Sequence, residues 1–150
     1  MDTDTLAPDA TQRPLGIAYL IGRLEHVLGQ QLRDSLGQHG LTASQYSMLS
    51  LLQAHGQLSN AQLAERSLVS PQAANEMVKV MQGKGWIERE PDPGHGRIIR
   101  LRLSASALPL LLACDRAVAQ QEQRMLAEVA LDERLQLQQL LQTLLSGLAH

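Results

Sequence analysis

Residues 59–82, SNAQLAERSLVSPQAANEMVKVMQ, decide the fold, because they hold two helix starts in close succession. Ser59 and the glutamine three residues later form a capping box, in which each side chain bonds the backbone amide of the other residue. Ser70-Pro71 is the second start, with serine at the N-cap and proline at the first helical position. The stretch therefore predicts a helix over 61–67, a short break and a second helix over 71–82, which together form a helix-turn-helix.

The second helix has the polar side chains of a base-reading helix. In a helix-turn-helix, this helix lies in the major groove and its N-terminal side chains contact base edges. Gln and Asn can read adenine, Glu can accept from cytosine, and Lys can reach guanine or phosphate. The expected DNA contacts are Ser70, Gln72, Asn75, Glu76 and Lys79, and the expected core face is Ala73, Met77, Val80 and Met81. A solvated helix face is the alternative, and Glu76 either contacts cytosine or repels phosphates.

After the second helix the apolar period changes and predicts a β-hairpin. Residues 86–90 and 97–103 have the pattern of short strands, and PDPGHG over 91–96 is a turn between them. Beside a recognition helix, such a wing would lie along the adjacent minor groove. We expect Arg97, with His95 next to it at the tip, to enter the negative potential there, and Arg100 and Arg102 to face phosphates.

Long amphipathic helices flank this centre on both sides. Apolar residues recur at helical spacing over 16–36, and a capping box at Thr42-Ala43-Ser44-Gln45 opens a helix to about residue 54. Two more helices are expected over 106–129 and 132–149. The stripe from Ile17 to Leu32 and the leucines from Leu135 to Leu148 are too apolar for one monomer to bury both. They predict a dimer seam.

The charge pattern favours nucleic acid although the formal net charge is −2. Basic residues concentrate in 60–103, and within 94–102 three arginines stand without any acid. Local charge matters here, because a phosphate backbone senses charge only within about 8 Å. A single cysteine, no secretory signal and no apolar run of membrane length indicate a soluble cytoplasmic protein.

The chain resembles the MarR family of transcription regulators over residues 15–148. The resemblance rests on the order and spacing of LTASQYSMLSLL, LAERSLVSP, GKGWIERE and RIIRLRLS. It implies an obligate homodimer built from the first and last two helices, with an effector pocket between these helices and the winged-helix body. This chain departs from the family where the wing tip reads His95-Gly96-Arg97 instead of Asp-Arg-Arg. It departs again at Glu76, where Arg is common, and at Pro109, where the following helix either starts late or is kinked.

Four residues form a candidate site for an anionic or aromatic small-molecule effector. Tyr19, Arg23 and His26 share one face of the first helix, and Tyr46 could join them at the domain junction. An ordinary polar surface or a dimer contact is the alternative. Cys114 lies on an apolar stripe, which favours a buried, inert thiol over a redox sensor.

The sequence therefore predicts a mainly α fold with a small β-hairpin wing. Its expected parts are a disordered tail over 1–13, a winged helix-turn-helix over 41–103, and a helical dimerisation region over 14–40 and 104–150. The expected function is a homodimeric transcription regulator, a repressor by preference, on palindromic double-stranded DNA. An adaptor that binds protein through the same fold is the alternative. No enzyme, metal or cofactor motif is present, and the turn histidines are not spaced as metal ligands.

Overall fold

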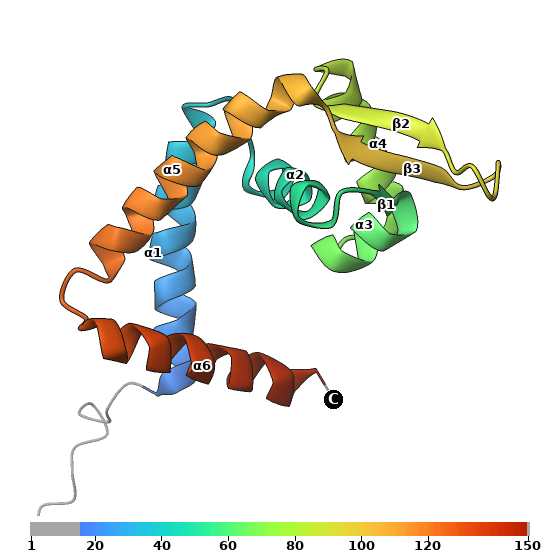
Figure 1. The fold of residues 1–150 in the computed structure, drawn as a ribbon. Coiled ribbons are helices and arrows are strands. Elements are labelled where there is room, and N and C mark those ends of the chain that lie inside the picture. Colours follow the sequence, from blue (N-terminus) through green and yellow to red (C-terminus); the bar gives the residue numbers. More distant parts are fainter. Residues whose placement is uncertain (1–15, 150) are drawn as a thin grey trace, which may run out of the picture.

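The computed structural model describes residues 16–149, so the expected tail over 1–13 lies outside the described residues. The fold is mostly helical, and the middle of the chain forms a small β-sheet (Figure 1). The elements are α1 (Ile17–Gly37), α2 (Ala43–His55), β1 (Leu58–Ser59), α3 (Asn60–Ser67), α4 (Pro71–Gly83), β2 (Ile87–Pro91), β3 (Ile99–Leu103), a 3-10 turn (Ala105–Ala107), α5 (Leu108–Met125) and α6 (Leu131–Leu148). The predicted fold class is confirmed.

Three predicted helix starts form as the local sequence requires. The Thr42 hydroxyl accepts the Gln45 amide proton at 3.1 Å, and the Ser59 hydroxyl accepts that of Gln62 at 3.2 Å. In both boxes the glutamine side chain also bonds the backbone amide of the cap residue. Ser70 caps α4 in the same way. These bonds satisfy amides that the first helical turn leaves without partners.

The sheet has a third strand that the sequence interpretation missed. The predicted hairpin is present as β2 and β3, and β1 pairs with the other edge of β3 to give the order β1-β3-β2. β1 has only two residues, so it has no pattern of its own and exists through its pairing with Leu101 and Arg100. The hairpin turn is longer than the expected 91–96, because β2 extends to Pro91 and β3 begins only at Ile99, which leaves 92–98 between the strands.

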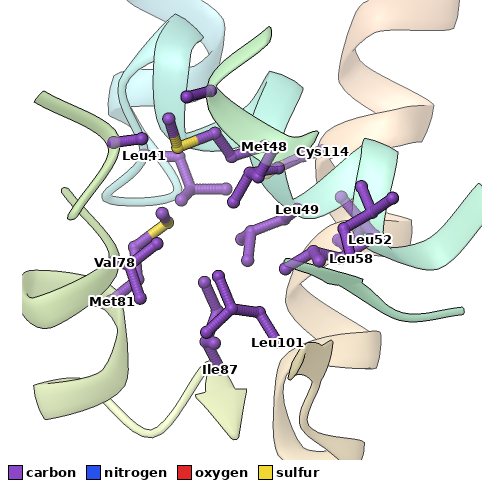
Figure 2. Close-up of a cluster of buried hydrophobic side chains, with 14 of the residues drawn as sticks. Leu41, Met48, Leu49, Leu52, Leu58, Val78, Met81, Ile87, Leu101 and Cys114 are labelled. Atoms are coloured by element: carbon purple, nitrogen blue, oxygen red, sulfur yellow. The ribbon is translucent and has the colours of Figure 1, made fainter. Parts of the chain in front are cut away.

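The core lies where α2, α3, α4 and the sheet meet, with α5 closing one side (Figure 2). Leu49, Leu52 and Leu101 are at most 1% exposed there. The predicted core face of α4 is confirmed at Met81 and in part at Met77, which packs against the core, but it is wrong at Val80 and omits Ala74 and Val78. The buried residues are Ala74, Val78 and Met81, spaced i, i+4 and i+7, whereas Val80 is 52% exposed.

α5 leads away from the winged helix, and α6 turns back from its far end (Figure 1). α5 packs along α1, and the Gln121 side chain donates to the Ser35 hydroxyl at 2.9 Å. α5 starts at Leu108 with Pro109 in its first turn, as the late-start alternative predicted. It ends at Met125 rather than near residue 129, because Arg134 of α6 donates to two carbonyls of the α5–α6 connection. α6 then lies at the far end of α5 (Figure 1).

Candidate nucleic-acid interface

The polar face of α4 is held outward by the burial of its opposite side. Gln72, Glu76 and Lys79 are exposed and Asn75 is half-buried, all on one helical stripe. Ser70 lies at the start of this stripe, where its hydroxyl accepts the amide proton of Ala73 at 3.1 Å. The structure therefore brings together the five residues predicted on this helix.

Asn60 is a supporting residue that the sequence interpretation did not single out. It is the first residue of α3, and its side-chain amide donates to the Pro71 carbonyl at 3.1 Å. The bond ties the start of α3 to the first turn of α4, so it helps to set the angle between the two helices. An asparagine inside a helix start carries no local signal for such a contact, which depends on the tertiary fold.

The wing projects from the body of the protein as a two-stranded arm (Figure 1). His95 and Arg97 are exposed at its tip, as predicted. From the sequence, the three arginines Arg97, Arg100 and Arg102 were expected to have no acidic partner. This expectation is wrong for Arg100 and Arg102. Arg100 forms an ion pair with Asp92 at 2.9 Å, and Arg102 contacts Glu88 at 2.8 Å and Glu90 at 2.7 Å.

The strand register explains this correction. Glu88 lies directly opposite Arg102 in the β2–β3 ladder. Glu90 is opposite Arg100 and reaches Arg102 diagonally, and Asp92, just after β2, reaches Arg100 in the same way. Opposite charges that face each other across strands attract, and the pairing draws the arginines toward β2. Within residues 16–149, Arg97 at the tip and Arg89 in β2 are therefore the wing arginines that have no ion pair.

Asp92 is the second residue that sequence reasoning missed. Its carboxylate accepts the amide proton of Gly94 and the guanidinium protons of Arg100. These two partners hold the pKa of the Asp92 carboxyl below its ordinary value, with the Gly94 amide as the larger cause. The signal was present in the sequence, since an Asp two residues before Gly in a turn favours this side-chain bond to the backbone.

The four effector candidates do not gather in one groove. Tyr19, Arg23 and His26 are exposed on α1, whereas Tyr46 lies on α2 with its hydroxyl donating to Asp115 of α5 at 2.6 Å. Burial, and next the Asp115 carboxylate, raise the pKa of Tyr46 to about 12. An open groove of about 500 Å³ beside Tyr46 is lined by α2 residues and Arg66, without any residue of α1.

Other site types find no support within residues 16–149. Cys114 is fully buried, as predicted, and burial raises the pKa of its thiol. No cluster of His, Cys, Asp and Glu in this part of the chain could hold a metal ion. None of the helices described combines the length and the apolar character that a membrane span requires.

Comparisons with known proteins agree on one family. The MarR family model matches residues 39–98. An HTH-type transcriptional repressor of Mycobacterium tuberculosis is 30% identical over 139 residues, which are 93% of this chain and 96% of the relative. The multiple antibiotic resistance protein MarR of Escherichia coli is 26% identical over 130 residues, covering 83% of this chain and 90% of that protein.

Solved structures show the same fold. Wild-type MarR from E. coli in its apo form superposes with a TM-score of 0.76 at 23% identity, covering 89% of this chain and 98% of that one. A mutant MarR from E. coli complexed with operator DNA has a TM-score of 0.75 at 24% identity, covering 85% and 92%. From the family match, the M. tuberculosis relative and the winged-helix geometry, this chain belongs to the MarR family of winged-helix transcription regulators.

Proposed function

We propose that this protein represses transcription as a homodimer bound to a palindromic operator. The observation that carries the proposal is the joint exposure of the polar α4 stripe and the unpaired Arg97 of the wing beside it. A helix of this kind reads the major groove, and an arginine on a neighbouring arm suits the narrow minor groove. The structure of a MarR mutant with operator DNA supports this placement by analogy of fold.

Within this surface we assign base contacts to Gln72, Asn75, Glu76 and Lys79. Ser70 and the free amides of the α4 N-terminus suit a phosphate, because that helix end carries partial positive charge. His95 lies at the wing tip beside Arg97 and is assigned to the same contact. The proposed DNA-binding domain spans 41–103.

The apolar surface of α6 supports the homodimer. Within residues 16–149, no α6 residue is buried, and leucines such as Leu144 and Leu145 are 45% and 69% exposed. α1 likewise exposes Leu24 by 47%. Continuous apolar surface of this size marks an interaction site. We therefore assign 14–40 and 104–150 to dimerisation, with the two apolar stripes of the partners packed together.

A small-molecule effector is the remaining part of the proposal. Tyr46 bridges the winged helix to α5 through Asp115, so a ligand that displaces this bond would act at the junction between the two regions. The nearby Arg66 would favour an anionic or aromatic ligand. Tyr19, Arg23 and His26 belong to α1 and would meet such a ligand only if the partner subunit completes the pocket.

The DNA-binding proposal is tested with duplexes selected by the full-length protein from a random-sequence pool. Wild-type affinity for the selected duplex should fall steeply as salt rises, with a log–log slope of about −0.9 per phosphate contact. Asn75→Ala should lose about 1–3 kcal/mol of discrimination at one base position per half-site, whereas Arg97→Ala should weaken binding to every sequence. Failure to select any sequence, or a flat salt response, would favour the protein-binding adaptor.

The dimer is tested by sedimentation of two matched α6 variants. Leu144→Asp places a charge in the proposed seam and should shift the protein toward monomer. Gln139→Asp adds the same charge on the opposite side of α6 and should leave the dimer intact. A wild-type protein that sediments as a stable monomer at micromolar concentration contradicts this part of the proposal.

A further inference from the structure

Asp92 uses its whole carboxylate within the wing. One oxygen, Oδ1, accepts the amide proton of Gly94 at 2.9 Å. The other, Oδ2, accepts from Arg100 Nε at 2.9 Å and lies 2.9 Å from Arg100 Nη2. The Asp92 side chain is only 11% exposed, although it lies in a projecting arm. An acid beside a DNA-binding surface is unfavourable unless its charge is neutralised, and here both oxygens are occupied.

The backbone of the wing tip is built on the same residue. The Asp92 amide donates to the Ile98 carbonyl at 2.8 Å, and the Asp92 carbonyl accepts the His95 amide proton at 3.2 Å. The Ile98 amide in turn donates to the His95 carbonyl at 2.9 Å. Ile98, the residue directly after Arg97, therefore has both its backbone amide and its backbone carbonyl hydrogen-bonded within the tip.

This bonding compensates for a flexible tip sequence. Gly94 and Gly96 lie on either side of His95, and glycine loses more backbone freedom than any other residue when it is ordered. If the tip were mobile in the free protein, it would lose this conformational entropy when Arg97 bound the DNA, and the affinity would be lower. A tip that Asp92 already orders in the free protein loses this entropy during folding, so DNA binding does not have to supply it.

The second ion-pair group of the wing differs in kind. Arg102, Glu88 and Glu90 are between 43% and 48% exposed, and none of these side chains is bonded to the tip backbone. Exposed pairs of this sort contribute little to stability. This group offers a control with the same charge on the same hairpin.

We propose that Asp92 is a positioning residue for DNA binding, and that Arg100 acts through Asp92 instead of as a phosphate ligand. Together they hold the tip so that Arg97 is presented to the minor groove. The inference rests on the proposed DNA-binding function and names the residues that make the wing competent for it. It also assigns Arg100 a different role from the phosphate contact expected from the sequence.

The test measures the affinity of full-length variants for the duplex selected by the wild-type protein, at several salt concentrations. Asp92→Asn keeps an oxygen for the Gly94 amide and removes the charge that holds Arg100. We expect about three- to tenfold weaker binding, the range set by ordering one side chain and its loop. Arg100→Met should weaken binding by a similar factor without changing the salt slope, and the double variant should be no weaker than either single variant.

Glu90→Gln is the matched control, because it removes one negative charge from the same hairpin without touching the tip. We expect its affinity to equal or exceed that of the wild type. NMR relaxation of the free protein gives a readout that does not depend on DNA. The Arg97 amide should become more mobile in Asp92→Asn and in Arg100→Met, and should be unchanged in Glu90→Gln.

Two results would overturn the inference while leaving DNA binding intact. If Arg100 is a phosphate ligand, Asp92→Asn frees it and binding becomes tighter, whereas Arg100→Met makes the salt slope of the bound dimer shallower by about 1.8, which is about 0.9 for each subunit. If Arg97 is equally mobile in all variants, Asp92 does not order the tip. A wild-type protein that selects no duplex refutes the proposed function itself. Should Asp92→Asn fail to fold, Arg100→Met alone still separates the two roles.

Discussion

Leu68 is a position where one substitution should make this protein more stable. Three helices end with the same pair of backbone bonds, and in each these bonds come from a residue with a positive φ and from the residue after it. At the ends of α1 and α4 the positive-φ residue is glycine, Gly40 with φ 78° and Gly85 with φ 77°. At the end of α3 it is Leu68, with φ 58° and ψ 36°. A leucine thus occupies a left-handed position that favours glycine.

The size of the effect follows from the backbone and the exposure of this leucine. The left-handed backbone conformation costs a residue with a Cβ about 1–2 kcal/mol of steric strain. Glycine removes that strain but loses about 0.5–1 kcal/mol through greater freedom of the unfolded chain. The Leu68 side chain is 93% exposed, so its removal forfeits almost no burial. Leu68→Gly should therefore raise the free energy of unfolding by up to about 1.5 kcal/mol, with about 0.75 kcal/mol at the centre of the range, which corresponds to about 2–3 °C in Tm.

Urea unfolding at a fixed protein concentration measures this difference. Concentration must be constant because the stability of a dimer depends on it. Leu68→Ala is the control, since alanine loses the exposed side chain but keeps the Cβ and its strain. It should stay within about 0.5 kcal/mol of the wild type. If the glycine variant is no more stable than the alanine variant, the strain argument is wrong.

Two further predictions concern the junction of α2 and α5. The pKa of Tyr46 is raised to about 12, so the folded protein keeps a proton that the unfolded chain releases near pH 10. The free energy of unfolding should therefore fall between about pH 10 and 12, and Tyr46→Phe should abolish this fall while the exposed-site variant Tyr19→Phe retains it. The buried Cys114 thiol should resist an alkylating reagent until urea unfolds the protein. Equal reaction rates in native and unfolded protein would contradict its burial.

The features that could be predicted from the sequence are those set by neighbouring residues. The capping hydroxyls of Thr42, Ser59 and Ser70 find their amides within three residues, so the helix starts follow from the local sequence. The end of α5 does not, because it depends on Arg134 from the next helix.

The errors on α4 and in the wing have the same origin. Apolar residues at 73, 74, 77, 78, 80 and 81 fit two adjacent stripes, and only packing against α3 and the sheet selects the one that contains Val78. The polar residues predicted on α4 nevertheless lie together away from the core, because they share one helical stripe in either phase. In the wing, the ion pairs of Arg100 and Arg102 depend on strand register, which the sequence of one strand does not contain.

The pairing of these arginines makes dimerisation more important for binding. On the polar stripe of α4 and at the wing tip over 92–98, among residues 16–149, Lys79 and Arg97 are the lysine and arginine outside ion pairs. Counting one neutralised phosphate for each of these two cations, whether or not it also reaches a base edge, gives a salt slope of about −2 for one subunit and about −4 for a dimer. Because linked sites reach affinities that neither reaches alone, the exposed leucines of α6 contribute to operator affinity by joining two weak surfaces. A Leu144→Asp monomer should then show about half the slope of the wild type.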